Sequence, residues 1–348
     1  MVDLSRFDPN AVNKYSSNIF GLPFNEEDAS LVILPVPWEV TVSNIAGTAR
    51  APERILKASR QIELTDEDVQ NGWRHGFYMR DIDKKILLKS DYLRKEAELF
   101  INYIEQGEDV LNNKFMCKII KEVNDSCEFL NNWVYTQAKE VLMNDKLVGL
   151  LGGDHSTALG FLKAIAEKHR DFGVLQIDAH CNLREAFESF KYSHASVMYN
   201  ALQEVPEITK LVQLGARDYS SDEADFINNS NGRVTSYFDK KIKEQMFEGA
   251  SWKEITDDIV KHLPEKLYIS FDIDGLDPKL CPGTGSPVHG GFEVDQIFYL
   301  LKKIAQSGRE FIGFDLSEVG ISSNGWDETV GARVLFKLCN IMVNGKNK

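Results

Sequence analysis

Histidine and aspartate residues that could bind a metal ion recur directly after short apolar segments of this 348-residue chain. Asp178 and His180 stand two residues apart in QIDAHCNLR. Asp272 and Asp274 have the same spacing in SFDIDGLDP. Because residues two apart in an extended strand end project to the same side, we expect each pair to share a site. Histidine nitrogen combined with carboxylate oxygen suits Mn²⁺, Fe²⁺, Zn²⁺ or Ni²⁺ better than Ca²⁺ or Mg²⁺.

Two further polar groups follow apolar segments of the same kind, His155 in GGDHS and Glu318 in FDLSE. His155 taken alone has a plain structural explanation, because GGDHS could simply begin a helix. Their recurrence at several strand ends favours a shared site, since ligands bind beyond the carboxyl ends of the strands in an open α/β sheet. Two bridging carboxylates there would allow two metal ions, which generate and hold a nucleophilic hydroxide.

Asn182 is the exception in this pattern. It stands two residues beyond His180, where a third ligand of the same kind would point in the same direction. An amide oxygen can bind a metal ion, but it carries no charge. The stretch therefore indicates either a metal site with one altered ligand or a polar strand end.

Alternating apolar and helix-like segments predict the elements that must position these residues. Segments 156–169 and 293–307 repeat apolar residues at helical spacing. The alternation indicates right-handed strand–helix–strand units, and so an α/β fold of three α/β/α layers around a central, mostly parallel sheet. Six short apolar runs are the expected buried strands: 30–39, 146–155, 172–180, 210–218, 266–274 and 311–318.

Residues 80–145 differ from the rest of the chain. This segment is rich in Lys, Glu, Asn and Leu, and it reads as helices with a loosely defined connection at 106–114. We find no Pro- or Gly-rich linker that would mark a second domain. The simplest organisation is a single domain over residues 1–348 with a helical elaboration at about 80–145.

Charge and composition argue against several classes of protein. The chain has 40 Lys and Arg against 53 Asp and Glu, a formal net charge of −13. Phosphate contacts need clustered basic residues, so we expect no nucleic-acid partner. No apolar run approaches the ~20 residues that span a bilayer, and the N-terminus lacks the features of a signal peptide. With five cysteines and no C-x-x-C pair, these features predict a cytoplasmic protein with no membrane partner.

The motifs GGDHS, DAHxx and SFDIDGLDP, in this order, resemble those of the ureohydrolases, the family of arginase and agmatinase. The resemblance extends from about Leu31 to the C-terminus and is weakest over 80–145. It implies an arginase-like α/β/α fold and two Mn²⁺ ions that serve the hydrolysis of guanidino compounds to urea. The three motifs are specific for the superfamily and much less specific for the substrate.

The resemblance also implies a role for each motif residue. His155 would bind the first metal ion, and His180 and Asp274 the second. Asn182 occupies the position of an aspartate that binds the first ion in the family. The implied metal ligands are His155, Asp178, His180, Asn182, Asp272 and Asp274, with Asp178 and Asp272 bridging the two ions.

Two further residues match catalytic positions of the family. Glu318, in FDLSEV, matches the glutamate that pairs with the substrate guanidinium, and a carboxylate can orient that planar group through paired hydrogen bonds. His194, in YSHASV, matches the histidine assigned as proton shuttle. The implied catalytic residues are His194, Glu318, Asp178 and Asp272.

Asn182 changes the charge balance of the implied centre. Four aspartates in the family supply a charge of −4 around two ions, whereas this chain supplies −3. We therefore expect the first ion to bind more weakly. A second hypothesis follows, that of a metal-poor, catalytically weak homologue acting as a binding protein. Five unchanged ligand positions, together with Glu318 and His194, favour the enzyme.

The loop after the DAHxx motif carries the indication of substrate. LREAFESFKYSHASVMY lacks the Asn/Thr/Ser-rich character of arginases and resembles the loop of agmatinases, as does PGTGSP further on. Hydrolysis of agmatine to putrescine and urea is therefore favoured. Formimidoylglutamase or arginase-type activity stays open, because Arg184 and Lys191 could bind a substrate carboxylate. The family also implies a homo-oligomer, a trimer or a hexamer.

Overall fold

One eight-stranded sheet forms the centre of the computed structural model, which describes residues 2–11 and 18–344. The strand order is β2-β1-β3-β8-β7-β4-β5-β6, and every adjacent pair is parallel. The predicted three-layer α/β fold is confirmed, with a sheet that is parallel throughout. The strands are β1 Leu31–Pro35, β2 Phe77–Met79, β3 Leu147–Leu151, β4 Phe172–Ile177, β5 Ile208–Leu214, β6 Val234–Tyr237, β7 Lys266–Asp272 and β8 Glu310–Ser317.

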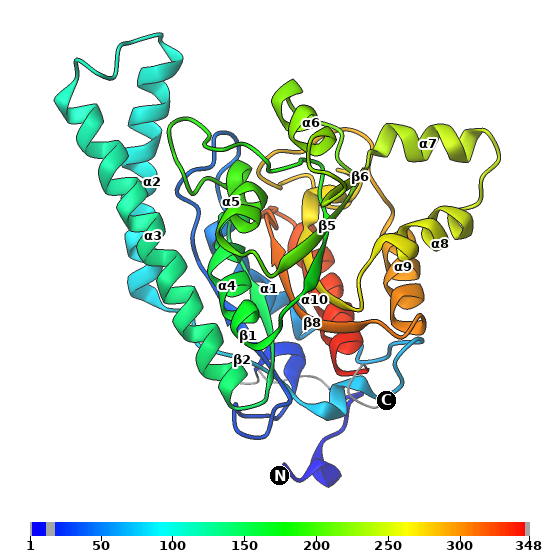
Figure 1. Cartoon of the computed structure of the whole chain (residues 1–348). Coiled ribbons are helices and arrows are strands. Elements are labelled where there is room, and N and C mark those ends of the chain that lie inside the picture. The colour runs from blue at the N-terminus through cyan, green and yellow to red at the C-terminus, as the bar shows by residue number, and fades with distance from the viewer. Residues whose placement is uncertain (1, 12–17, 345–348) are drawn as a thin grey trace.

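Helices cover both faces of the sheet (Figure 1). One layer holds α1 Ala51–Ser59, α7 Asp239–Phe247, α8 Trp252–His262, α9 Val294–Gln306 and α10 Trp326–Asn344. The other holds α2 Lys84–Glu105, α3 Lys114–Met143, α4 Ala158–Lys168 and α5 Val197–Glu204. A further helix, α6 Ser221–Asn228, follows β5 near the carboxyl ends of the strands.

Alternation along the strands divides the apolar side chains between two cores. In β1, Leu31 and Ile33 pack into the core that includes α10, whereas Val32 and Leu34 pack into the core that includes α3 and α4. All five residues of β1 are buried. Burial on both faces explains why the strands read as continuous apolar runs.

Two strands were missed by the sequence prediction, both at the edges of the sheet. β2 spans only three residues, and β6 has the sequence VTSY, of which only the valine is fully buried. A short edge strand pairs on one side only and needs no continuous apolar run. The apolar pattern therefore carries no signal for either of them.

The strand order brings the predicted site residues together. The four neighbouring strands β3, β8, β7 and β4 lie at the centre of the sheet. His155 follows β3, Glu318 follows β8, Asp272 ends β7 and Asp178 follows β4. Because the strands are parallel, all four residues lie at the same edge of the sheet.

Most of the segment 80–145 is helical and forms α2 and α3. Helices α2 and α3 pack against each other as a long antiparallel hairpin along one flank of the molecule (Figure 1). Asp83 and Asn113 cap their N-termini by accepting hydrogen bonds from first-turn backbone N–H groups. Helix α3 also packs against α4, which follows the turn that carries His155.

The turn before His155 is fixed by close backbone contact. Asp154 N donates to Trp38 O at 2.8 Å, and Glu318 N donates to Gly153 O at 2.8 Å. A Cβ at Gly153 would lie 1.9 Å from the Trp38 carbonyl oxygen. Only glycine allows the chain to pass between these two segments, so Gly153 sets the position from which His155 enters the site.

Substitution of Gly153 tests this constraint. We expect Gly153→Ala to lower the free energy of unfolding by roughly 2–3 kcal/mol and to weaken divalent-cation binding, because the turn must move. Denaturant unfolding and equilibrium dialysis with Mn²⁺ measure the two effects. Gly232→Ala is the control, since its Cβ meets open space and its φ of +78° costs about 1 kcal/mol without touching the site. If both variants lose the same amount of cation affinity, the close contact at Gly153 does not set the position of His155.

Candidate metal centre

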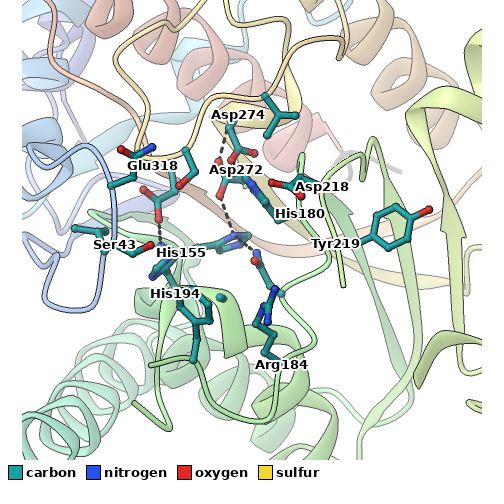
Figure 2. A pocket seen from close by; sticks show the side chains of 18 of the residues that line it. Ser43, His155, His180, Arg184, His194, Asp218, Tyr219, Asp272, Asp274 and Glu318 are labelled. Atoms are coloured by element: carbon teal, nitrogen blue, oxygen red, sulfur yellow. Dashed lines mark hydrogen bonds and ion pairs between the residues drawn. The ribbon is translucent and has the colours of Figure 1, made fainter. Parts of the chain in front are cut away.

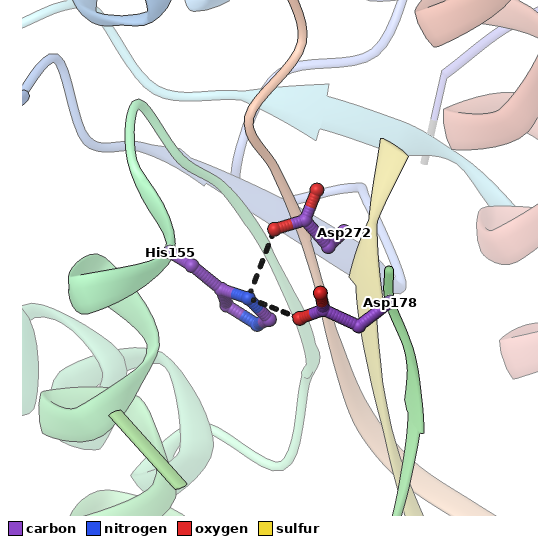
Figure 3. A group of neighbouring side chains, drawn as sticks. All are labelled: His155, Asp178 and Asp272. Atoms are coloured by element: carbon purple, nitrogen blue, oxygen red, sulfur yellow. Dashed lines mark ion pairs between the residues drawn. The ribbon is translucent and has the colours of Figure 1, made fainter. Parts of the chain in front are cut away.

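His155 faces two carboxylates at the carboxyl edge of the sheet. Its Nδ1 lies 3.0 Å from Asp178 Oδ2 and 3.1 Å from Asp272 Oδ2 (Figure 3). All three side chains are buried. Their ligand atoms lie within 4.8 Å of one another, so one cation could bind all three. We call this trio the first cluster.

A second cluster lies beside it and consists of Asp178, His180 and Asp274. His180 Nδ1 is 2.9 Å from Asp274 Oδ2 and 3.5 Å from Asp178 Oδ1. Asp178 thus belongs to both clusters, with one oxygen toward each histidine. Asp272 belongs to the first cluster, and its Oδ1 accepts a hydrogen bond from Asp274 N of the second cluster at 2.9 Å.

The backbone after β7, which carries Asp274 of the second cluster, is held by segments that follow β5 and β4. Arg217, just after β5, donates to Asp274 O at 2.7 Å and to Leu276 O at 3.1 Å. Ala179 N donates to Asp274 Oδ1 at 2.9 Å. The sequence analysis missed Arg217, although it stands in the GARD segment that ends the fourth predicted strand.

Asn182 reaches the first cluster through a turn rather than through strand alternation. β4 ends at Ile177, and Asn182 has a φ of 53°, in the left-handed region that asparagine tolerates better than most residues. Its Nδ2 donates to Asp178 Oδ2 at 2.7 Å and lies 3.1 Å from His155 Nδ1. The amide therefore touches the ligand atoms of the first cluster, with its nitrogen rather than its oxygen toward the carboxylate.

Carboxylates set the charge on both histidines. Burial alone lowers the pKa of His180, but the facing carboxylates of Asp274 and Asp178 raise it to about 12. The pKa of His155 is raised well above its usual value against burial by hydrogen bonds to Asp178 and Asp272. Burial, Asp274 and Asp178 raise the pKa of Asp272. The carboxylates of the site therefore hold both histidines protonated, and a bound cation would displace these protons.

The ring of His155 is oriented from behind. Its Nε2 lies 2.8 Å from Ser270 Oγ and 3.6 Å from Asp315 Oδ1. Both residues come from the central strands β7 and β8 and are fully buried. Hydrogen bonding of the second ring nitrogen is the usual means by which proteins fix a metal-binding histidine.

Glu318 presents a carboxylate beside the first cluster. Its φ of 60° places it in the left-handed region, and its Oε1 accepts a hydrogen bond from His155 N at 2.9 Å. Oε2 is buried and accepts no hydrogen bond from the part of the chain that the structure describes. Burial and the nearby Asp272 raise the pKa of Glu318 well above its usual value. A strained, partly unsatisfied carboxylate at this place is suited to receive a cationic ligand.

Both clusters open into a cleft of about 320 Å³ (Figure 2). Its walls include the predicted His155, His180, Asn182, Arg184, His194, Asp272, Asp274 and Glu318. Lys191 does not line it, because its Nζ pairs with Glu204 at 3.0 Å. Sequence reasoning missed Asp218 and Tyr219, which line the cleft beside His180. The signal was available, since Asp218 ends an apolar run in the same manner as the motif residues do.

His194 lies on the wall of the cleft. It begins a short 3₁₀ turn, His194–Ser196, capped by the Ser193 side chain. Burial, followed by the positive charges of His180 and His155, lowers the pKa of His194 to about 3. The ring is therefore neutral near pH 7, with one N–H donor and one acceptor nitrogen, which allows it to relay a proton.

The donor set fits divalent metal ions of the Mn²⁺ type. Each cluster supplies one histidine nitrogen and two carboxylate oxygens, the mixture that such ions accept. Asp178 is shared between the two clusters, as expected of a residue that bridges two ions. Asn182 lies against the first cluster and presents an uncharged amide to it.

This fold and site define an α/β protein with two adjoining metal-binding clusters at the carboxyl edge of a parallel sheet. The chain belongs to the arginase family, whose pattern matches residues 29–339.

Relatives of known name cover nearly the whole chain. The N(1)-aminopropylagmatine ureohydrolase of Thermus thermophilus is 28% identical over 310 residues, 89% of each chain. The agmatinase of Neisseria meningitidis is 28% identical over 344 residues, 97% of this chain and 96% of that one. Among solved structures, the agmatine ureohydrolase of Thermoplasma volcanium has a TM-score of 0.69 at 20% identity and covers 93% of this chain and 94% of that chain. This structural similarity supports the fold alone.

Asn182 offers a direct test of the first cluster. We expect Asn182→Asp to raise the Mn²⁺ affinity of this cluster at least about tenfold, or ~1.4 kcal/mol. Two unit charges 4 Å apart attract each other by ~4 kcal/mol at an effective dielectric constant of 20, and the cost of desolvating the added carboxylate offsets much of such a gain. Equilibrium dialysis at limiting Mn²⁺ measures the occupancy.

Asn44→Asp is the matched control for this experiment. It adds the same charge to an exposed position on the cleft wall, without contact to the cluster. If Asn182→Asp binds no more Mn²⁺ than the unaltered protein, position 182 is not a ligand.

Cation binding should depend on pH. A histidine must be unprotonated to bind a metal ion, and the pKa of His180 is raised to about 12, so binding displaces a proton. Apparent Mn²⁺ affinity is therefore expected to rise with pH between roughly pH 6 and pH 8, by about tenfold per unit for each displaced proton. Calorimetric titration in buffers of different ionisation enthalpy counts the protons. A pH-independent affinity would argue against histidine ligation.

Proposed function

We propose that this protein hydrolyses a guanidino compound and releases urea, with agmatine, which gives putrescine, as the preferred substrate. The observation that carries the proposal is the pair of clusters sharing Asp178, with the unsatisfied carboxylate of Glu318 beside them in one cleft. Membership of the arginase family supports it. The named relatives agmatinase and N(1)-aminopropylagmatine ureohydrolase support the substrate class.

Two divalent ions, with Mn²⁺ proposed, are the cofactors, and when bound they supply Lewis acidity that lowers the pKa of a water molecule toward neutrality. His155, Asp178, Asp272 and Asn182 would hold the first, and Asp178, His180, Asp272 and Asp274 the second. Asn182 makes the first position the weaker one.

Glu318 is proposed to orient the substrate. A guanidinium is planar and cationic, and a carboxylate receives it through paired hydrogen bonds. The backbone N–H of His155 already holds Oε1 of Glu318, so the side chain is fixed before substrate enters. The reacting carbon is thereby placed beside the clusters.

His194 is proposed to move the proton that the departing amine needs. Its neutral ring lines the cleft and can accept a proton on one nitrogen while it donates from the other. The aromatic ring of Phe187 stands nearly perpendicular to it, with 6.1 Å between the ring centroids. This contact limits the rotation of the imidazole.

Asp218 supports a substrate with a cationic tail. It is an exposed carboxylate on the cleft wall, and it forms no hydrogen bond or ion pair through its side chain among the described residues. Arg184 supports the alternatives with a carboxylate, formimidoylglutamate or arginine. Its charge is already engaged, however, because the guanidinium lies 5.0 Å over the Phe187 ring and 3.8 Å from Glu223. The free charge in the cleft is therefore negative and favours an amine.

A catalytically weak binding protein is the second candidate, and Asn182 is the observation behind it. If the amide holds the first cluster by hydrogen bonds to Asp178, cation loading is incomplete. The remaining ligands and Glu318 support the enzyme instead.

Location and assembly stay predictions. All five cysteines are unpaired, which is compatible with the proposed reducing cytoplasm. No helix among the described residues is long and apolar enough to cross a bilayer. A homo-oligomer, trimer or hexamer, remains the expectation from the family.

Urea release separates the candidates. After loading with Mn²⁺, we expect the protein to produce urea from agmatine faster than from arginine or 4-guanidinobutyrate, and to produce little formamide from formimidoylglutamate. Bound metal is measured on the same sample. If the fully Mn²⁺-loaded protein forms product from none of these compounds, the hydrolase is excluded and the binding protein is left as the candidate.

Charge at the cleft rim tests the tail preference. We expect Asp218→Asn to raise the KM for agmatine about fivefold with kcat nearly unchanged, because one exposed ion pair of about 1 kcal/mol is lost. Asp222→Asn is the control, since it removes an exposed charge outside the cleft. Arg184→Ala should leave agmatine turnover intact. A large loss in Arg184→Ala with no loss in Asp218→Asn would point to a carboxylate substrate.

A further inference from the structure

A two-residue turn on the cleft wall has an unfavourable backbone. Phe187 N donates to Phe190 O at 3.2 Å, and Phe190 N donates to Phe187 O at 2.9 Å. The residues between them, Glu188 and Ser189, have φ values of 52° and 65°. Turns with two left-handed residues strongly prefer Asn-Gly. Glu-Ser is poorly suited to this conformation, so something outside the turn must hold it.

The side chain of Glu188 does not stabilise the turn. Burial, followed by the nearby Glu105, raises its pKa to about 7. Its Oε2 is buried without a hydrogen-bond partner among the described residues. The turn therefore gains little stability from its own residues.

Helices α2 and α3 supply the missing support. On α3, Asn124 Oδ1 accepts a hydrogen bond from Lys191 N at 2.9 Å, and Asn124 Nδ2 donates to Ser189 O at 3.3 Å. One side chain thus fixes the backbone on both sides of Phe190. On α2, the buried Phe100 packs edge-on against Phe190, with 5.5 Å between ring centroids. The two helices hold the turn by one polar and one apolar contact.

The turn in its held position shapes the cleft. Phe187 lines the cleft and contacts the proposed proton-transfer residue His194 and one further residue of the cleft wall, Arg184. The Arg184 guanidinium lies 5.0 Å over its ring, and the His194 ring stands at 87° to it. A displacement of the turn would move Phe187 and release both neighbours. The metal clusters, by contrast, lie on the central strands and do not depend on the turn.

We propose that the α2–α3 hairpin is a brace for the turn Phe187–Phe190, and that Asn124 is a positioning residue for substrate binding. The inference gives a role to the segment 80–145 and deepens the proposed function, on which its kinetic consequence rests. Its structural consequence does not require activity. Loss of Asn124 frees the backbone around Ser189, loosens Phe187 and weakens substrate binding without loss of metal.

Asn124→Ala tests the brace. Because the two hydrogen bonds of the Asn124 side chain to the turn are lost, we expect the KM for agmatine to rise about fivefold, with kcat within about twofold and Mn²⁺ occupancy unchanged. Hydrogen exchange of the Phe187 and Phe190 amides is expected to be at least about fivefold faster. Asn132→Ala is the matched control, because Asn132 is exposed on the same helix. It should change neither quantity.

Rescue distinguishes positioning from general destabilisation. In the Asn124→Ala protein, Glu188→Asn with Ser189→Gly introduces the residues that this turn prefers, and should restore both KM and slow exchange. Unchanged exchange in Asn124→Ala, or faster exchange that the turn substitutions fail to restore, would overturn the brace. Hydrogen exchange is measured without substrate, so it tests the brace whether or not the protein is active. If the protein hydrolyses no guanidino compound, the proposed function is contradicted, and the exchange result still decides the brace.

Discussion

The carboxylate of Asp178 is the interaction on which the site depends. It faces His155 with one oxygen and His180 with the other, and the same oxygen that faces His155 accepts the amide of Asn182. Burying a charge of this kind is costly unless it is paired. The two histidines provide that pairing, and their hydrogen bonds lower the pKa of Asp178 against the effect of burial. A cation shared by the two clusters would satisfy the same carboxylate more completely.

The rest of the fold serves to bring these groups to one edge. Parallel strands β3, β8, β7 and β4 deliver residues that are far apart in sequence, and close glycine contacts set the angle at which His155 enters. Glu318 lies beside the clusters with a left-handed backbone, and its unpaired carboxylate oxygen suits a guanidinium. The cleft above is bounded by Asp218 on one strand end and by the turn at Phe187, which the α2–α3 hairpin supports.

Sequence alone predicted the part of the site that follows strand patterns. Asp178, His180, Asp272 and Asp274 come together because each pair follows or ends a strand that is readable as an apolar run. The strand order was not predicted, and Asp274 lies in a 3₁₀ turn rather than in an extended strand end. The place of Asn182 beside the first cluster agrees with its motif position, but its left-handed turn and its contact through nitrogen are decided by local packing, which no periodicity reports. The edge strands β2 and β6 and the role of Asn124 were missed for a similar reason. Each depends on contacts between distant segments rather than on the character of its own segment.

Asp178 is expected to serve two adjoining cation sites of unequal strength. Anomalous scattering from crystals of the unaltered protein soaked in Mn²⁺ tests this expectation most directly. We expect a strong peak among Asp178, His180 and Asp274 and a weaker one among His155, Asp178 and Asp272. If neither cluster shows a peak at saturating Mn²⁺, the two proposed cation sites are contradicted.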